Sequence, residues 1–136
     1  MRVEPFDLSH LSGAVANRKQ AHFQALLESD VISKVGRNWS VIDGEGLICV
    51  GGMVDTDDGI EAWVLFTENI TPARFVVVYR EFARRLTKMQ ETGKAVFIHV
   101  DPTYPEAVRM AEKLGFQVVG EELFGGRNMI RMVTNV

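Results

Sequence analysis

Apolar positions recur with two different periods along the chain, and the switches between these periods outline the first half of the fold. Arg2 to Pro5 has the pattern of a short strand. From Leu8 to Leu27 apolar residues return at helical spacing, which predicts one long helix or two short ones with a break near Gly13. Because glycine after aspartate suits a tight turn, the next segment predicts a three-stranded antiparallel meander. Its three apolar runs are Trp39 to Ile42, Leu47 to Val54 and Ile60 to Phe66.

A long helix opens the second half of the chain. Thr71 can cap this helix, and Pro72 can take its first position, where the missing N–H is no loss. The apolar stripe that follows has helical spacing and ends at Gly93, a typical C-terminal stop. Lys94 to Val100 is mainly apolar and is therefore expected to form a strand buried on both faces.

A short helix and a hairpin close the chain. Thr103 followed by Glu106 has the pattern of a capping box, which predicts a helix start. Gly115 is the natural end of this helix. The remaining runs predict a hairpin, formed by Phe116 to Leu123 and Asn128 to Val133 around Gly125 and Gly126.

The order of these elements predicts an α/β (α+β) fold, in which a sheet is covered by helices. The order is strand, one or two helices, three strands, helix, strand, helix and two strands. The chain has 136 residues and contains no repeat and no low-complexity linker. Residues 1–136 are therefore expected to form a single domain.

Composition and charge exclude several classes of function. The chain is 46% hydrophobic and 24% charged, which is typical of a folded protein, and its net charge is −3. Positive charges gather on one predicted helix face only, which argues against a nucleic-acid groove. There is no long apolar run and no apolar block near the N-terminus, so no membrane contact is expected and the protein is predicted to be cytoplasmic. The charges of that helix face come from Arg80, Arg84, Arg85 and Lys88.

Cysteine and histidine are too sparse for a metal centre. Cys49 is the single cysteine, so the chain can form no internal disulfide, and its apolar surroundings predict a buried thiol. The three histidines, His10, His22 and His99, lie far apart and none has a partner at metal-ligand spacing. No metal is therefore expected.

Two local patterns indicate a family. The first is AVRMAEKLGF, Ala107 to Phe116, in which Ala107, Met110 and the run Glu112 to Phe116 match a known helix motif in register. The second is the run LICVGG followed by the strand IEAWVLF and a helix. With the order of elements, these patterns resemble the GCN5-related N-acetyltransferase superfamily over nearly the whole chain. Within it the chain looks most like divergent acetyltransferase-like proteins of tailed phages.

The resemblance implies a mixed, mostly antiparallel sheet of six to seven strands and a site for acetyl-coenzyme A beside a splayed strand. The family's glycine-rich phosphate loop corresponds here to TENITPAR, Thr67 to Arg74, which contains no glycine. Without glycine, side chains hinder close approach of the backbone to phosphate. A helix start with free N–H groups and an arginine fork still favours anions. The implied cofactor-binding residues are Leu65, Phe66, Thr67, Ile70, Thr71, Ala73, Arg74, Ala107 and Ala111.

Acetyl transfer to an amine needs a base, and two residues are candidates. A lysine-like amine has a pKa near ~10.4 and is mostly protonated at neutral pH. Strand alternation places Glu61 on one face of its strand, and His99 shares a face with Phe97. Glu61 can act through water, as a glutamate on this strand often does in the family, and His99 is the alternative base.

The proton donor to the leaving thiolate is a point of departure from the family. The family usually places a tyrosine at the position of Ala111, and a methyl group cannot donate a proton. The family's frequent asparagine corresponds to Tyr104, which is a candidate acid or an aromatic residue that covers the core. The glycines of CVGG, Gly51 and Gly52, indicate either a bulge or a relief of crowding between strands.

Two functions remain open at this level. One is an acetyl-coenzyme A-dependent N-acetyltransferase of weak activity that acts on a primary amine of a small molecule or a protein. The other is a non-catalytic domain of the same fold, a phage or prophage protein that serves virion assembly or binds another protein. A homodimer is compatible with both.

Overall fold

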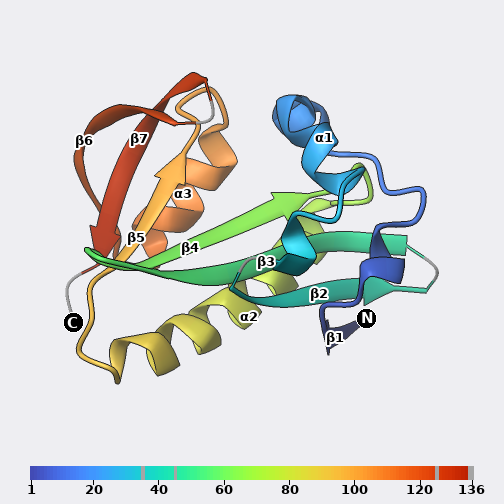
Figure 1. Cartoon of the computed structure of the whole chain (residues 1–136), viewed down its shortest axis with the longest axis horizontal. Coiled ribbons are helices and arrows are strands. Elements are labelled where there is room, and N and C mark those ends of the chain that lie inside the picture. Colours follow the sequence, from blue (N-terminus) through green and yellow to red (C-terminus); the bar gives the residue numbers. More distant parts are fainter. Residues whose placement is uncertain (35, 45, 125, 135–136) are drawn as a thin grey trace. The chain divides into compact units, whose positions relative to one another are not determined.

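The computed structural model of the chain describes residues 1–34, 36–44, 46–124 and 126–134 (Figure 1). The predicted Gly125-Gly126 turn is therefore described only at Gly126, because Gly125 lies outside these ranges. The elements in chain order are β1 (Arg2–Pro5), the 3₁₀ turns η1 (Leu8–Leu11) and η2 (Arg18–Phe23), α1 (Gln24–Leu27), the 3₁₀ turn η3 (Ile32–Lys34), β2 (Arg37–Asp43), β3 (Gly46–Thr56), β4 (Gly59–Phe66), α2 (Pro72–Gln90), β5 (Val96–Val100), α3 (Pro105–Lys113), β6 (Gln117–Phe124) and β7 (Arg127–Thr134).

Within the described ranges the strands form a seven-stranded sheet in the order β1-β2-β3-β4-β5-β7-β6. The pairs β1–β2, β2–β3, β5–β7 and β6–β7 are antiparallel, whereas β4 and β5 run parallel. The expected mixed, mostly antiparallel α/β fold is confirmed. Every helix within these ranges is too short or too polar to cross a bilayer.

The chain divides into two compact units. The first unit comprises Met1–Val54 and Trp63–Val78, and the second comprises Asp55–Ala62 and Tyr79–Val136. The elements β3, β4 and α2 run from one unit into the other. The expectation that residues 1–136 act as one domain stays a prediction.

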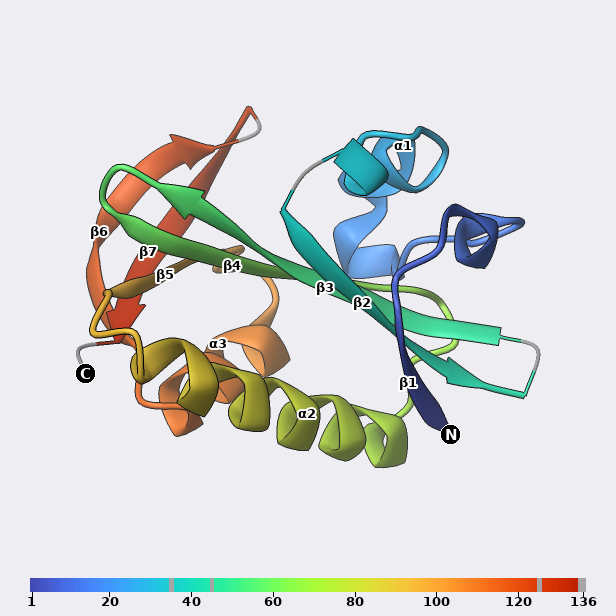
Figure 2. The ribbon, with the colours of Figure 1, turned by 60° about the horizontal axis from the view of Figure 1, so that its bottom comes forward.

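The first unit buries its core between strands and short N-terminal turns. In Figure 2, α1 and the start of α2 lie on opposite sides of β2 and β3. The predicted break at Gly13 is present, with φ at 70°. The prediction of one or two helices over Leu8–Leu27 is wrong in type, because η1 and η2 are 3₁₀ turns and α1 is a single α-helical turn. The core consists of Leu11, Ala16, Leu27, Ile32, Ile42, Leu47, Val50 and Leu65.

The two adjacent glycines of β3 make room for tryptophan rings. A Cβ atom on Gly51 would lie 2.4 Å from Cζ2 of Trp39, and one on Gly52 would lie 2.7 Å from Cζ2 of Trp63. The register shift in this strand pair lies between Val41 and Ile42, where Ile48 is the extra residue of β3, whereas Gly51 and Gly52 pair regularly with Trp39 and Asn38. Relief of crowding, one of the two expected roles, therefore explains the glycines.

In the second unit α3 follows β5 and leads into β6 (Figure 1). At its C-terminus Gly115 has φ at 93°, its N–H donates to the Glu112 carbonyl, and the Phe116 N–H donates to the Ala111 carbonyl. This pair of hydrogen bonds is a Schellman motif, which satisfies carbonyls that the helix end leaves open. The AVRMAEKLGF stop therefore has a structural role, and Phe116 is buried beneath it.

The predicted capping box at the start of α3 is wrong. The N-cap residue is Tyr104, which makes no side-chain cap. The side chain of Thr103 instead donates to Oδ1 of Asp101 at 2.7 Å, and its N–H donates to the same oxygen at 2.8 Å. Asp101 therefore organises the turn and draws Thr103 away from the helix.

The expectation that β5 is buried on both faces is also wrong. Val96, Ile98 and Val100 are buried, whereas Phe97 and His99 are only half-buried. Because successive side chains point to opposite faces of a strand, one face of β5 packs into the core and the other is accessible. The accessible face carries the chemistry described next.

Candidate functional site

The two candidate bases meet on the accessible face of the second unit. Glu61 lies in β4 opposite Phe97 of β5, so its side chain shares a face with Phe97 and His99. Nδ1 of His99 lies 2.5 Å from Oε1 of Glu61. Phe97 and His99 lie on one face of β5, as strand alternation predicted, and Glu61 forms a hydrogen-bonded pair with His99.

A second carboxylate completes the arrangement. Nε2 of His99 hydrogen bonds to Oε1 of Glu122 from β6, so that both ring nitrogens contact a carboxylate oxygen. The imidazole is enclosed, with 8% of its side chain exposed, compared with 19% for Glu61 and 48% for Glu122. Solvent therefore reaches this chain of groups from its Glu122 end.

Arg131 of β7 supplies a positive charge beside these groups. Its guanidinium carbon lies 3.9 Å from the centre of the Phe97 ring. Nε of Arg131 lies 3.7 Å from Oε1 of Glu122, and Nη2 lies 3.7 Å from Oδ2 of Asp58. We refer to Asp58, Glu61, Phe97, His99, Glu122 and Arg131 as the His99 cluster.

The environment shifts the pKa values of the two glutamates of the His99 cluster in opposite directions. Burial raises the pKa of Glu61, and the hydrogen bond with His99 only partly offsets this effect. At Glu122 the hydrogen bond from His99 lowers the pKa, because it stabilises the ionised form. Glu61 thus holds a proton more readily than Glu122, which is the separation that proton transfer within one site requires.

Sequence reasoning missed Glu122, Arg131 and Asp58. The alternation of β6 alone does not reveal Glu122, because a register shift between Val118 and Gly120 changes which residues share a face. Arg131 could have been found from its place opposite His99 in the β5–β7 pair. That pairing requires knowledge of the strand order, which a linear pattern does not contain.

Tyr104, the candidate acid, belongs to the core of the second unit. It is 5% exposed, and burial raises the pKa of its hydroxyl to about 12. Its backbone N–H donates to the carbonyl of Asp101. Of the two expected roles, these features favour the aromatic residue that covers the core.

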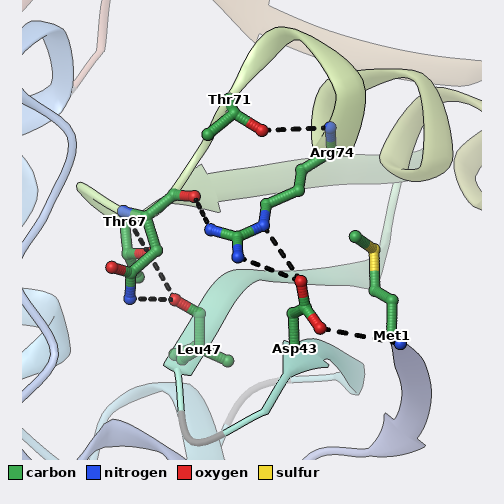
Figure 3. A network of polar contacts seen from close by, with 7 residues as sticks. Met1, Asp43, Leu47, Thr67, Thr71 and Arg74 are labelled. Carbon is green, nitrogen blue, oxygen red and sulfur yellow. Dashed lines mark hydrogen bonds and ion pairs between the residues drawn. The ribbon is translucent and has the colours of Figure 1, made fainter.

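The residues expected to bind phosphate lie in the first unit, where the charged group among them is already paired. Figure 3 shows that the Arg74 guanidinium points at Asp43, whose other oxygen faces the Met1 amino group. Nε and Nη2 of Arg74 donate to Oδ2 of Asp43 at 3.2 and 3.0 Å, and Nη1 donates to the Asn69 carbonyl at 2.7 Å. We refer to Asp43, Asn69, Thr71 and Arg74 as the Arg74 network. The positive charge that could attract phosphate is already paired within it.

The polar groups at the end of β4 also have hydrogen-bond partners within the protein. Thr67 is 1% exposed and its hydroxyl contacts the carbonyls of Leu47 and Ile48. The N–H of Phe66 donates to Oε1 of Gln20 at 2.8 Å, and the Phe66 ring stacks on Phe75. Leu65 is buried in the core of the first unit. These three expected cofactor-binding residues therefore stabilise the fold of this unit.

A pyrophosphate at the start of α2 would need backbone N–H groups that do not already donate to the protein. The N–H groups of Glu68, Asn69, Ile70, Arg74 and Phe75 all donate to acceptors of the protein. In the arrangement described, the guanidinium and most amides of this turn are occupied. The turn therefore does not fit a tightly held pyrophosphate. The N–H groups for which the structure gives no acceptor are those of Thr71 and Ala73, while Pro72 has none.

The remaining expected cofactor residues are on α3. Ala111 is 2% exposed and packs in the core of the second unit, whereas Ala107 is half-buried. No group of three or more histidine, cysteine or acidic side chains suited to a metal ion occurs in the part of the chain that the structure describes.

Comparison with known proteins places the fold but not the family. No family model matches the chain, and no curated protein is significantly similar in sequence. Among solved structures, an aminoglycoside 6'-acetyltransferase type Ii aligns with a TM-score of 0.70 at 16% identity, over 99% of this chain and 97% of that one. A Bacillus subtilis acetyltransferase in complex with CoA aligns with a TM-score of 0.67 at 14% identity, over 99% and 98%.

A third solved structure, a mutant of spermidine N-acetyltransferase from Vibrio cholerae, aligns with a TM-score of 0.65 at 15% identity, over 98% of this chain and 92% of that one. At these identities the likeness shows the fold alone, which is that of the GCN5-related N-acetyltransferases.

Proposed function

We propose that the chain is an N-acetyltransferase-like protein that transfers an acetyl group from acetyl-coenzyme A to a primary amine. The observation that carries this proposal is the hydrogen bond between Glu61 and His99 on the accessible face of the second unit. The acetyltransferases that share the fold include enzymes named for spermidine and aminoglycosides, both of which carry amines.

In the transfer the amine nitrogen forms a bond to the acetyl carbon, the thioester C–S bond breaks, and coenzyme A leaves as a thiolate that takes up a proton from solvent. The chemistry required of the protein is removal of a proton from the attacking amine. Most of a free amine is protonated at neutral pH and cannot attack a carbonyl carbon. Glu61 accepts this proton on its carboxylate, directly or through one water molecule. The short hydrogen bond to His99 then allows the proton to be shared with Nδ1 of the ring.

The raised pKa of Glu61 strengthens this role. A carboxylate with an ordinary pKa is a weak base toward an ammonium group, and burial makes Glu61 a better proton acceptor. Glu122 stays ionised, and its charge stabilises the positive charge that develops on the ring. The pair is therefore suited to general-base catalysis.

Binding of the acetyl donor is expected to be weak. The Arg74 network pairs the cation of the expected phosphate turn with Asp43. We expect a dissociation constant for acetyl-coenzyme A of about 1 mM or higher, which corresponds to about 4 kcal/mol of binding free energy.

The test is an acetylation assay by mass spectrometry on a panel of primary amines that includes spermidine, an aminoglycoside and a lysine peptide. The donor is raised to several millimolar, because tight binding is not expected. Product should form faster than in the absence of protein, and Glu61→Gln should reduce this excess. If no amine is acetylated above the uncatalysed rate at any donor concentration, the proposal fails.

A second candidate function is a non-catalytic protein-binding module, including the phage or prophage assembly role. Two observations favour it. The Arg74 network occupies the phosphate turn, and β6, the outermost strand of the sheet, exposes large apolar side chains. These are Val118 at 59%, Val119 at 54% and Leu123 at 72% exposure. Exposed apolar residues at a strand edge are suited to a partner or to a second copy of the chain.

The two candidates differ in one inexpensive measurement. A ligand that binds only the native state must raise the melting temperature by mass action. Acetyl-coenzyme A at 10 mM, which is about ten times a dissociation constant of ~1 mM, should raise the melting temperature if the chain binds the donor. An unchanged melting temperature would favour the binding module.

A further inference from the structure

Both ring nitrogens of His99 contact carboxylates, and this arrangement constrains the protonation state of the ring and of the two carboxyl groups. A neutral imidazole has one N–H and one lone pair, so it can donate to only one of two ionised carboxylates. If Glu61 and Glu122 were both ionised and the ring neutral, one ring nitrogen would face a carboxylate with no proton between them. The contact between Nδ1 and Glu61 is therefore complete only when these three side chains hold one further proton, which is the proton that a base at this site takes up.

The position of Glu122 results from one extra residue in β6. Val118 pairs with Met132, but Gly120 pairs with Arg131, so Val119 is accommodated as a bulge. Met132 and Arg131 are successive residues and point to opposite faces of β7. The bulge therefore switches the face of every β6 residue after it, and it places Glu122 on the face of His99.

The same switch places the neighbouring Glu121 on the opposite face. Glu121 pairs with Ile130, whereas Glu122 pairs with Met129, which shares a face with Arg131. The strand thus carries two adjacent glutamates of equal charge, and Glu122 is the one that hydrogen bonds to the imidazole. This pair of residues is a matched control within the protein.

We propose that Glu122 is a positioning residue that holds His99 with its Nε2–H toward β6, so that the lone pair of Nδ1 faces Glu61 and the pair can share the proton taken from the amine. The inference rests on the proposed function, because it assigns Glu122 to the base of that reaction. Glu122 itself does not contact the reacting atoms. It acts through His99, as the carboxylate of a carboxylate–histidine pair fixes the tautomer and orientation of its imidazole.

Among the described residues, two carboxylates contact the imidazole, Arg131 lies beside one of them, and Asp58 contacts Arg131. Glu61 comes from β4, Asp58 from the turn that precedes it, Glu122 from β6 and Arg131 from β7. Without the negative charge of Glu122, the positive charge of Arg131 is less well balanced. The resulting excess of positive charge disfavours a further positive charge on the His99 ring. The Glu61–His99 pair should then accept a proton less readily.

The test compares Glu122→Gln with Glu121→Gln in two measurements. The first is the ¹⁵N NMR titration of the His99 ring in the protein without substrate, with the signal assigned from a His99→Gln spectrum. The second is the pH dependence of kcat/KM for acetyl transfer. In Glu122→Gln we expect both the ring titration and the acid limb of the rate profile to move to a pH lower by about 0.5 to 1. Glu121→Gln should move neither.

The two measurements separate the inference from the proposed function. If the ring titration moves only in Glu122→Gln but no acetyl transfer is found, the positioning role holds and the proposed function fails. If the ring titrates identically in both variants, or if the rate profile does not follow the ring, the inference is overturned. Circular dichroism of each variant shows whether the fold is retained, and Glu122→Asp, which keeps the charge, should restore most of the wild-type behaviour.

Discussion

The Arg74 network and the His99 cluster contain similar side chains but differ in what these side chains can still do. In the Arg74 network, a guanidinium donates to Asp43 and to a carbonyl, so its hydrogen bonds serve the first unit itself. In the His99 cluster, an imidazole lies between two carboxylates whose pKa values burial and hydrogen bonding move in opposite directions. The Arg74 network thus holds an ion pair, whereas the His99 cluster is arranged for proton transfer.

The difference separates the residues that stabilise the fold from those that could serve a reaction. The Gly115 stop of α3 belongs to the first group, because its role is structural. At the expected phosphate turn, a charge that could attract the donor is paired with Asp43. Catalytic capacity thus depends on which hydrogen-bonded groups can still exchange a proton, since function lies in the site rather than in the scaffold.

The largest expected effect is loss of the proton acceptor in the His99 cluster. We predict that Glu61→Gln and His99→Gln each reduce kcat/KM by about 100-fold to 1,000-fold, because general-base catalysis contributes at least this much. The double variant should be no worse than the more damaging single variant, since the two residues act as a unit. Steady-state rates with a fixed amine give the answer.

His22→Gln is the control for that experiment, because His22 is exposed in the η2 turn of the first unit. Tyr104→Phe adds a second comparison. If the buried hydroxyl of Tyr104 has no catalytic role, this variant should keep at least half of the rate. Additive losses in the Glu61 and His99 variants, or full activity in either, would contradict a shared base.

Gly51 of the first unit should be sensitive to substitution although it has no catalytic role. A Cβ at this position meets the Trp39 ring at 2.4 Å, so Gly51→Ala forces the ring or the strand to move. We expect a loss of about 2 to 3 kcal/mol in the free energy of unfolding, as is typical of overpacking. Gly120→Ala is the control, because nothing lies within 4 Å of its Cβ. Urea denaturation of both variants should separate them, and equal stabilities would refute the crowding explanation.

Asp101 of the second unit provides a test by pH. Burial opposes its ionisation, but hydrogen bonds from Thr103 and the charge of Arg127 outweigh burial and lower the pKa of Asp101. A lowered pKa in the folded state means that the stabilisation is present above the unfolded pKa of ~3.9 and is lost as the pH falls through the folded value. Asp101→Asn should therefore cost about 2 kcal/mol at pH 7, and much less at pH 2.

Unfolding free energies at the two pH values check this prediction, with Asp57→Asn at an exposed position as the control. A deficit in Asp101→Asn that is the same at both pH values would show that the charge of Asp101 does not stabilise the fold.

Local patterns predicted most of the fold because local interactions fix most of its boundaries. Gly93 and Gly115 both have positive φ at helix ends, where their role follows from the backbone alone. The segment from Leu8 to Leu27 was harder, since 3₁₀ turns bury the same apolar residues as a helix with fewer hydrogen bonds of the helical type. The capping-box prediction at Thr103 failed because Asp101, two residues earlier, accepts the hydrogen bond of its hydroxyl.

The candidate site was predictable only in part. Glu61 and His99 could be proposed from alternation within their own strands, but the contact between them depends on the β4–β5 register. Glu122 depends on a bulge at Val119, which no short pattern indicates. Asp43 looked like an ordinary turn residue, and its contact with Arg74 joins positions 31 residues apart.

The most direct test of the account is the dependence of the acetyl-transfer rate on acetyl-coenzyme A concentration in the wild type and in Asp43→Asn. Asp30→Asn, which removes a carboxylate from an exposed ion pair with Lys34 in the same unit, serves as the control. We predict that Asp43→Asn lowers the KM for the donor about tenfold, or about 1.4 kcal/mol, with kcat little changed, because it releases Arg74 but leaves the His99 cluster intact. An unchanged donor KM in Asp43→Asn, or the absence of transfer in every variant, would contradict the account.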